Sequence, residues 1–177
     1  MRVVSGKYKG RKLKEFNLNT TKPTLDKVKE AIFDMIQFDV VNSVVLDLFS
    51  GTGALGIEAI SRGAKKTYLI DNNIQAIKII KENLKGITED YILLNQNAIE
   101  FLNSTDEKFD IVLLDPPYQT DLGLKAIEIL INENKLNEDA TIIFETSNDL
   151  NLELNYPNFK ITKKKYGTVA VYKLVKQ

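Results

Sequence analysis

One apolar run in the sequence ends in residues that can do chemistry. The run 111–114 is followed at once by Asp115, two prolines and Tyr118. Prolines often end strands, so this stop has a simple structural explanation. The chemical interpretation is that the strand brings a carboxylate, a rigid turn and an aromatic ring to one point. The candidate catalytic residues are therefore Asp115, Pro116, Pro117 and Tyr118.

This combination suits the transfer of a methyl group to an exocyclic amine of a nucleobase. The lone pair of such an amine is delocalised into the ring, which makes the nitrogen a poor nucleophile. Hydrogen bonds from the NH₂ group to the Asp115 carboxylate and to a carbonyl of the Pro116-Pro117 turn would draw the nitrogen towards tetrahedral geometry. Proline fixes φ and so holds these carbonyls in place, and Tyr118 offers a face on which an extruded base can stack.

A glycine-rich stretch indicates a binding site for a cofactor that contains a nucleoside. Residues 51–56 read GTGALG, a GxGxxG pattern, and Asp71 follows at about the spacing of a ribose-binding acid. Two cofactors compete for this pattern, NAD(P) and S-adenosylmethionine. Asp47 lies four residues before the glycines, where a carboxylate disfavours a pyrophosphate and suits the ammonium group of S-adenosylmethionine. We therefore expect S-adenosylmethionine, and we expect a side chain placed at Gly53 to enter its site.

Strand-like and helix-like segments alternate along the chain. Strands are predicted over 44–49, 67–70, 91–94, 109–114 and 141–144, helices over 25–37, 54–63, 73–86, 97–103 and 121–132, and a terminal hairpin over 159–174. This order predicts an α/β fold with a Rossmann-like, doubly wound and mostly parallel sheet. The chemical stretches follow the strands, and ligands collect at the carboxyl ends of such strands. Glu145 also follows a strand, but we expect it to be a solvated strand end.

The composition limits the chemistry. The chain has 177 residues, with no cysteine and no histidine. This excludes disulfides, thiolate nucleophiles, serine–histidine catalysis and the usual zinc sites, and no stretch has the alternating acids of a calcium loop, so we expect no metal. No segment approaches about 20 apolar residues, and the first residues have no apolar core long enough for a signal peptide. We therefore expect one domain over residues 1–177 that is soluble, cytoplasmic and not attached to a membrane.

Basic residues are concentrated at both ends of the chain. The net charge is zero, but residues 1–30 carry +6 and residues 160–177 carry another +6, so that the middle is acidic. Two basic ends favour the binding of a polyanion with an affinity that falls as salt rises. The alternative is a solvated arm that only aids solubility. Within a basic N-terminal extension of about residues 1–24, the candidate RNA-binding residues are Lys7, Lys9, Arg11 and Lys12.

Together, the motifs resemble those of the RsmD-type family, methyltransferases that modify the exocyclic N2 of a guanine in 16S ribosomal RNA. The resemblance covers nearly the whole chain and includes RVVSGKYKGRKL, KPTLDKVKEAIFDMI, VLDLFSGTGALGIEAISRGA, DPPY and YGTVAVYKL. It implies the class I methyltransferase sheet, which has seven strands with the last one antiparallel. It also implies S-adenosylmethionine as the methyl donor, and ribosomal RNA or the assembling small ribosomal subunit as the partner. We expect a monomer.

The resemblance also implies a role for each site residue. The glycines and their neighbours hold the methyl donor, Asp71 its ribose, and Asn97 and Ala98 its adenine. The family usually has Asp in place of Asn97 and often Glu in place of Asp71, so the adenine amino group would bond here to an amide oxygen. Residues 22–24, KPT, could lie over the donor pocket. The implied cofactor-binding residues are Asp47, Phe49, Ser50, Gly51, Thr52, Gly53, Asp71, Asn72, Asn97 and Ala98.

Two other functions stay open. The DPPY sequence also serves N6-adenine methylation of DNA or RNA, although 177 residues leave little room for a domain that recognises a DNA target. The other alternative is a non-catalytic RNA-binding module that has lost its cofactor. The intact glycines and Asp115 argue against that alternative.

Overall fold

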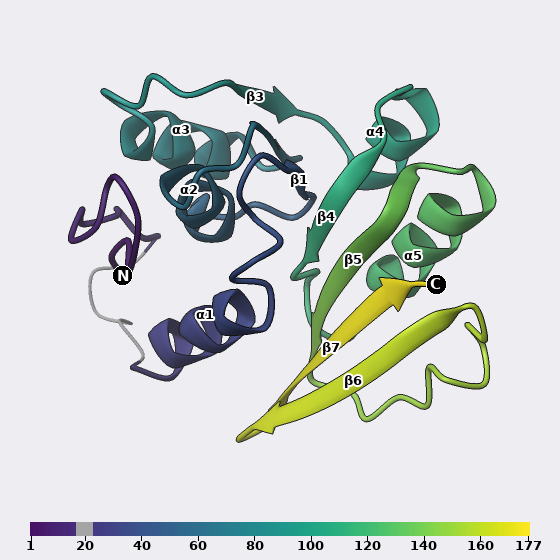
Figure 1. Cartoon of the computed structure of the whole chain (residues 1–177). Helices are drawn as coiled ribbons and strands as arrows, with labels where there is room; N and C mark the ends of the chain where they lie inside the picture. Colours follow the sequence, from purple (N-terminus) through teal and green to yellow (C-terminus); the bar gives the residue numbers. More distant parts are fainter. Residues whose placement is uncertain (17–22) are drawn as a thin grey trace.

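Seven strands form one sheet, in which five parallel strands are followed by an antiparallel hairpin (Figure 1). The computed structural model describes residues 1–16 and 23–177, with the side chains of the second range described from residue 26. The strands lie in the order β3-β2-β1-β4-β5-β7-β6. The elements in chain order are α1 (Pro23–Met35), β1 (Val44–Asp47), α2 (Ala54–Ser61), β2 (Lys66–Asp71), α3 (Ile74–Asn83), β3 (Tyr91–Asn95), α4 (Ala98–Ser104), β4 (Phe109–Leu114), α5 (Leu122–Asn132), β5 (Leu136–Thr146), β6 (Phe159–Tyr166) and β7 (Val169–Lys176).

Helices cover both faces of the sheet because the central strands are apolar on both faces. In β1, the neighbours Val45 and Leu46 are both completely buried, as is typical of a parallel strand between two layers of helices. Val45 packs in a cluster with residues of α1 and α2, and Leu46 packs in a cluster with residues of α4 and α5. Residues of α3 pack with those of α2, so α1, α2 and α3 cover one face while α4 and α5 cover the other (Figure 1).

The predicted alternation of strands and helices is confirmed, and so is the antiparallel C-terminal hairpin. Among the five parallel strands, two have a limit that differs from the prediction by two residues or more. β1 ends two residues earlier, because Leu48 and Phe49 already belong to a turn. β5 begins earlier, at Leu136, because a register shift between Phe109 and Ile111 of β4 lets an additional segment of β5 pair with β4.

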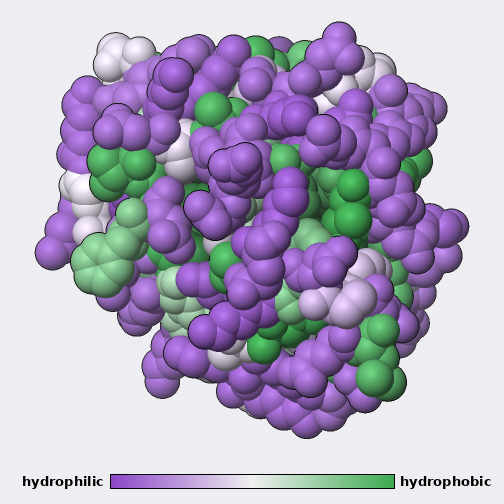
Figure 2. Space-filling view, turned by 45° about the vertical axis from the view of Figure 1, so that its right-hand side comes forward, coloured by the Kyte–Doolittle hydropathy of each residue, from purple (hydrophilic) through white to green (hydrophobic). Residues whose placement is uncertain are grey.

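The side of the molecule seen in Figure 2 is mostly hydrophilic, and its apolar side chains form small separate areas. The two most exposed large apolar side chains come from different parts of the chain: Phe38 follows α1 and Leu154 follows β5. Among the described residues, no helix is both long enough and apolar enough to cross a membrane.

The N-terminal segment, residues 1–16, packs against α2 and α3. Gly6 makes this contact possible, because its φ is +83° and a Cβ there would lie 1.8 Å from the carbonyl oxygen of Ser61 at the end of α2. Residues 1–16 are therefore packed against the domain, while the role of their basic side chains stays a prediction. Residues 17–22, the next part of the predicted extension, lie outside the described residues. Two apolar side chains of the segment are buried among those of the two helices, Val3 and Leu13.

A buried ionic group fixes this segment to the helices. The Glu58 carboxylate of α2 is completely buried and accepts hydrogen bonds from the backbone N–H groups of Val4 and Ser5 at 2.9 and 3.0 Å. It also pairs with Lys29 of α1 at 3.1 Å and with Arg62 at 2.9 Å. Such a buried carboxylate is tolerated because its partners compensate its lost hydration. Glu58 therefore joins α1, α2 and the N-terminal segment.

Asn83 extends this connection to the glycine loop, residues 50–53. Its side-chain oxygen accepts a hydrogen bond from the backbone N–H of Lys14 at 2.7 Å. Its NH₂ group donates to the carbonyl oxygens of Lys14 and Thr52, at 3.1 and 2.9 Å. One buried amide thus holds the N-terminal segment and the glycine loop together, so the segment belongs to the framework of the site.

Candidate active site

The carboxyl ends of three strands bring three acids to one edge of the sheet. Asp47 ends β1, Asp71 ends β2, and Asp115 follows β4. The strand order reverses where β1 and β4 lie side by side. Ligands of doubly wound sheets bind at such a point, so this edge is the candidate site.

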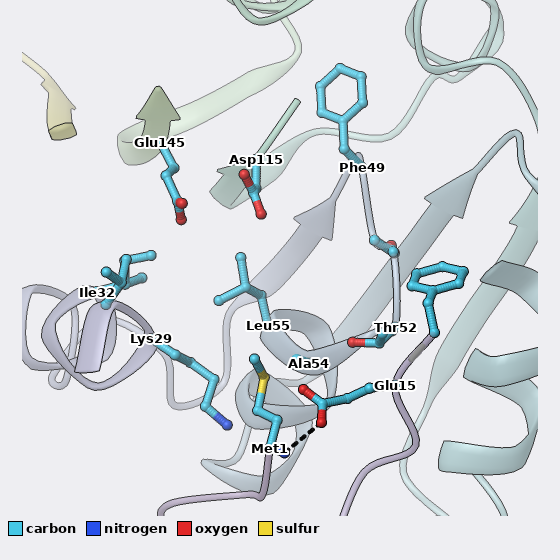
Figure 3. Close-up of a pocket in the computed structure, with 14 residues that line it drawn as sticks. Met1, Glu15, Lys29, Ile32, Phe49, Thr52, Ala54, Leu55, Asp115 and Glu145 are labelled. Carbon is cyan, nitrogen blue, oxygen red and sulfur yellow. Dashed lines mark ion pairs between the residues drawn. The ribbon is translucent and has the colours of Figure 1, made fainter. Parts of the chain in front are cut away.

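Two adjoining hollows open at this edge. The first has a volume of about 280 Å³ and extends from the glycine loop to α1 and the ends of β4 and β5, as Figure 3 shows. The second has a volume of about 490 Å³ and lies over the ends of β2 and β3 and the DPPY turn, residues 115–118. Both are lined by Phe16, Phe49, Gly51 and Asp115.

Most of the predicted site residues line one of these hollows. Ser50 and Thr52 line the first. Asp47 and Gly53 are absent from the lining of both, because they lie behind the glycine loop. The predicted residues that line the second hollow are Asp71, Asn72, Asn97, Ala98, Pro116, Pro117 and Tyr118.

Asp71 is held in place by the loop that it faces. Its Oδ2 accepts a hydrogen bond from the backbone N–H of Gly51 at 2.8 Å, and its Oδ1 accepts one from the N–H of Asn73 at 2.8 Å. An ionised carboxylate has about four lone-pair sites, so two remain for donors such as the hydroxyl groups of a ribose. The geometry of Asp71 therefore fits the role that its spacing predicts.

The two predicted loop glycines have different surroundings. Gly51 has φ +55°, and a Cβ there would meet no atom within 4 Å. Gly53 has φ +81°, but its Cβ would lie 3.3 Å from side-chain atoms of Ile57 and Ile80, between α2 and α3. A Cβ at Gly53 therefore points between the two helices, and the role of Gly53 in cofactor binding stays a prediction. Gly51 is the glycine whose missing side chain leaves the hollows open.

Asp47 lies beneath the loop. Its Oδ2 accepts a hydrogen bond from the Gly56 N–H in the first turn of α2 at 2.9 Å, and no described residue donates to its buried Oδ1. Burial and, to a smaller extent, the nearby charges of Asp115 and Asp71 raise the pKa of Asp47 to about 7. The free oxygen is an acceptor that a cationic ligand group could satisfy, so the role of Asp47 stays a prediction.

Asn97 caps α4. Its side-chain oxygen accepts hydrogen bonds from the backbone N–H groups of Ile99 and Glu100, at 2.9 and 3.2 Å. These bonds compete with the predicted hydrogen bond from an adenine amino group to the same oxygen. Asn97 and Ala98 do line the second hollow, so contact with an adenine stays a prediction, with the NH₂ group of Asn97 as the freer part of the side chain.

Packing holds the DPPY turn rigid. Gly123 of α5 lies so close that a Cβ there would be 3.0 Å from the Pro116 ring and 2.3 Å from the ring of Phe144. Asp115 receives no hydrogen bond from the described residues, and burial raises the pKa of its carboxyl group. Tyr118 is half exposed, and its hydroxyl donates to Glu145 at 3.3 Å. The turn thus offers a free carboxylate and an accessible ring.

Glu145 is a site residue that the sequence analysis missed. It was expected to be a solvated strand end, but it is only 6% exposed and lines the first hollow together with Asp115. The reason is that β4 and β5 are parallel neighbours in which Leu114 lies opposite Phe144. The residues that follow, Asp115 and Glu145, therefore face the same space (Figure 3). The sequence does carry a signal for this arrangement: the predicted strands 109–114 and 141–144 are each followed directly by an acid.

Replacing Glu145 by Gln is expected to stabilise the protein above neutral pH. Burial and the nearby charge of Asp115 raise the pKa of Glu145 above its ordinary value of 4.5, so the folded state binds its proton more tightly than the unfolded state. The free energy of unfolding of the wild type therefore falls as pH rises from about 4.5 towards neutral. The variant should gain about 1–3 kcal/mol at pH 8 and nothing at pH 4, measured by urea unfolding. An equal difference at both pH values would contradict this ionisation effect.

The predicted RNA-binding residues differ in whether their side chains already contact other parts of the protein. Lys7 pairs with Glu89 at 2.5 Å, and the Arg11 guanidinium donates to the carbonyl oxygen of Lys85. Lys9 and Lys12 are exposed, and no described acid pairs with either side chain. Lys9 and Lys12 are therefore the clearer candidates for contacts with phosphate.

The fold and the site define a class of protein, the class I methyltransferases. The solved structure "Putative methyltransferase yhhF from Escherichia coli" superposes on this chain with a TM-score of 0.88. The two sequences are 30% identical, and the superposition covers 100% of this chain and 98% of that one.

Sequence comparison gives the family. A family model described as "Conserved hypothetical protein 95" matches residues 1–175. The chain is 34% identical to "Ribosomal RNA small subunit methyltransferase D" of Haemophilus influenzae, over 98% of this chain and 92% of the relative. It is 40% identical to "Putative rRNA methyltransferase YlbH" of Bacillus subtilis, over 98% of each chain. The chain belongs to the RsmD-type family that its motifs resemble.

Proposed function

We propose that the protein methylates the exocyclic N2 amine of a guanine in 16S ribosomal RNA, with S-adenosylmethionine as the methyl donor. The observation that carries the proposal is the Asp115 carboxylate, which accepts no hydrogen bond from the described residues and lines both hollows. A ligand in one hollow and a base beside it would therefore both lie next to Asp115. The names of the Haemophilus influenzae and Bacillus subtilis relatives support ribosomal RNA as the substrate.

The residues around the hollows fit S-adenosylmethionine. Asp71 offers two lone-pair sites to the ribose hydroxyls, and Gly51 leaves room for the ligand beside the loop. Ala98 and Asn97 would contact the adenine. The buried free oxygen of Asp47 suits the ammonium group. When bound, the donor supplies a methyl group activated by a sulfonium.

The DPPY turn would prepare the amine. The Asp115 carboxylate accepts a hydrogen bond from the NH₂ group, and a carbonyl of the rigid Pro116-Pro117 turn accepts another, which directs the nitrogen lone pair away from the ring. The amine loses a proton when it gains the methyl group, and the raised pKa of Asp115 makes this carboxylate a suitable acceptor for that proton. The exposed ring of Tyr118 would stack on the extruded base.

The experiment is methyl transfer with identification of the product. The protein is incubated with isotopically labelled S-adenosylmethionine and 16S ribosomal RNA, free or in small subunits from cells that lack the protein. The RNA is digested, and its nucleosides are identified by mass spectrometry. We expect labelled N2-methylguanosine. Labelled N6-methyladenosine would support the adenine alternative, and donor binding without any labelled nucleoside would support a non-catalytic module.

Charge reversal at Lys9 and Lys12 is expected to weaken RNA binding without affecting the donor site. If both lysines contact phosphates, the double variant to Glu should bind any RNA sequence more weakly. The negative slope of log K against log salt should become shallower by about 1–2. Filter binding over a salt series measures this slope. Lys108→Glu is the matched control, because Lys108 is exposed and precedes β4 at the opposite edge of the sheet. An unchanged slope for the double variant would exclude this surface from RNA capture.

A further inference from the structure

A second carboxylate lies beside the position of the target amine. Glu145 lines the first hollow together with Asp115, and Figure 3 shows the two carboxylates facing the same space. They follow directly after paired residues of β4 and β5, and the backbones of such neighbouring strands are about 4.8 Å apart. A single base that bonds to Asp115 can therefore also reach Glu145.

The described residues leave the hydrogen-bonding capacity of these two carboxylates largely unused. Among the described residues, none donates a hydrogen bond to Asp115, and Glu145 receives a long one from the Tyr118 hydroxyl at 3.3 Å. Lys29 lines the same hollow, but its ammonium group pairs with Glu58 at 3.1 Å. Buried acceptors without donors cost free energy, and native proteins rarely keep them. The pair therefore suits a ligand that brings two donors side by side.

Among the bases that carry an exocyclic amine, guanine presents such a pair on its Watson–Crick edge. Its N2 amine lies next to the N1–H, and both groups donate. In adenine the ring nitrogen beside the N6 amine is an acceptor, and in cytosine the ring nitrogen beside the N4 amine is also an acceptor. A second carboxylate next to the amine site would repel these two bases and attract guanine.

We propose that Glu145 determines the base specificity of the site, because its carboxylate accepts a hydrogen bond from the N1–H of the guanine whose N2 amine bonds to Asp115. This inference rests on the proposed function and adds the feature of the base that is recognised. An adenine would place the lone pair of its N1 against the Glu145 carboxylate. A site whose buried polar group would stay unpaired rejects a substrate that lacks the matching donor by about 10⁴-fold.

The test replaces the target guanine of a short RNA substrate by 2-aminopurine. This base keeps the N2 amine but has an acceptor at N1. The wild type should methylate the guanine RNA about 100-fold faster or more. In Glu145→Gln the amide NH₂ can donate to that N1, so the ratio of the two rates should fall at least about tenfold. Glu138→Gln, an exposed position in the same strand, is the control and should keep the wild-type ratio.

Three results would overturn the inference. In the first, the wild type methylates both substrates equally fast. This measurement needs no variant, so it does not depend on whether a variant folds. Glu145→Gln could lower both rates by the same factor, which would indicate a general role. It could also weaken the binding of S-adenosylhomocysteine with an unchanged ratio, which would assign Glu145 to the donor. The proposed function fails separately, if the wild type forms no N2-methylguanosine in unmodified RNA.

Discussion

Replacing Asp115 by Asn is expected to lower turnover about 100- to 1000-fold while the affinity for S-adenosylhomocysteine changes by less than about threefold. The amide has the same shape, but it offers one acceptor oxygen in place of two and cannot take up a proton at neutral pH. The interaction with the amine changes in the transition state, so its loss should appear in kcat. Single-turnover methylation of RNA and calorimetric titration of the cofactor product measure the two effects.

The control for this variant is Asp106→Asn, which changes an exposed acid in the loop before β4. It should leave both measurements at wild-type values. Activity of Asp115→Asn within about threefold of the wild type would contradict the role of Asp115, since a group that contacts the reacting amine cannot be neutralised without effect. Equal losses of activity and of cofactor affinity would assign Asp115 to the donor.

The second large effect is expected at Gly51. Asn tolerates positive φ better than other residues with a side chain, so Gly51→Asn should fold, with its side chain in the open space next to the loop. This side chain would overlap with the space of the bound cofactor. Such an overlap costs about 1–3 kcal/mol, so S-adenosylhomocysteine should bind about 10- to 100-fold more weakly. The thermal unfolding midpoint should stay close to that of the wild type.

Gly53→Asn is the matched comparison, because Gly53 also has positive φ but lies against Ile57 and Ile80. Here the side chain would strain the packing between α2 and α3, and the unfolding midpoint should fall. A normal affinity in Gly51→Asn would mean that the donor does not approach the loop. A stable Gly53→Asn that fails to bind would identify Gly53 as a direct cofactor contact.

Much of the fold could be predicted because its signals are local. Each strand is a short apolar run, each helix has a periodic face, and their alternation dictates a parallel sheet with ligand groups at one edge. The positions of Asp71 and Asp115 followed from this rule. The limits of β5 did not, because they depend on a register shift in β4 that no pattern within β5 reveals.

The remaining features depend on contacts between distant parts of the chain. The N-terminal segment reads as a basic extension, but Gly6 and Glu58 bind it to α2 through contacts that span more than fifty residues. Glu145 reads as a strand end, and its burial follows from the neighbouring β4. The orientation of the Gly53 Cβ depends on how α3 packs against α2. Sequence spacing places such residues near a site but does not say which way they face.

The most direct test of the methyltransferase assignment is a calorimetric titration of the wild-type protein with S-adenosylhomocysteine and, separately, with NAD. Asp71 at the end of β2, the free space at Gly51 and the buried Asp47 oxygen predict saturable binding of S-adenosylhomocysteine and none of NAD. Binding of NAD together with no response to S-adenosylhomocysteine would contradict the assignment.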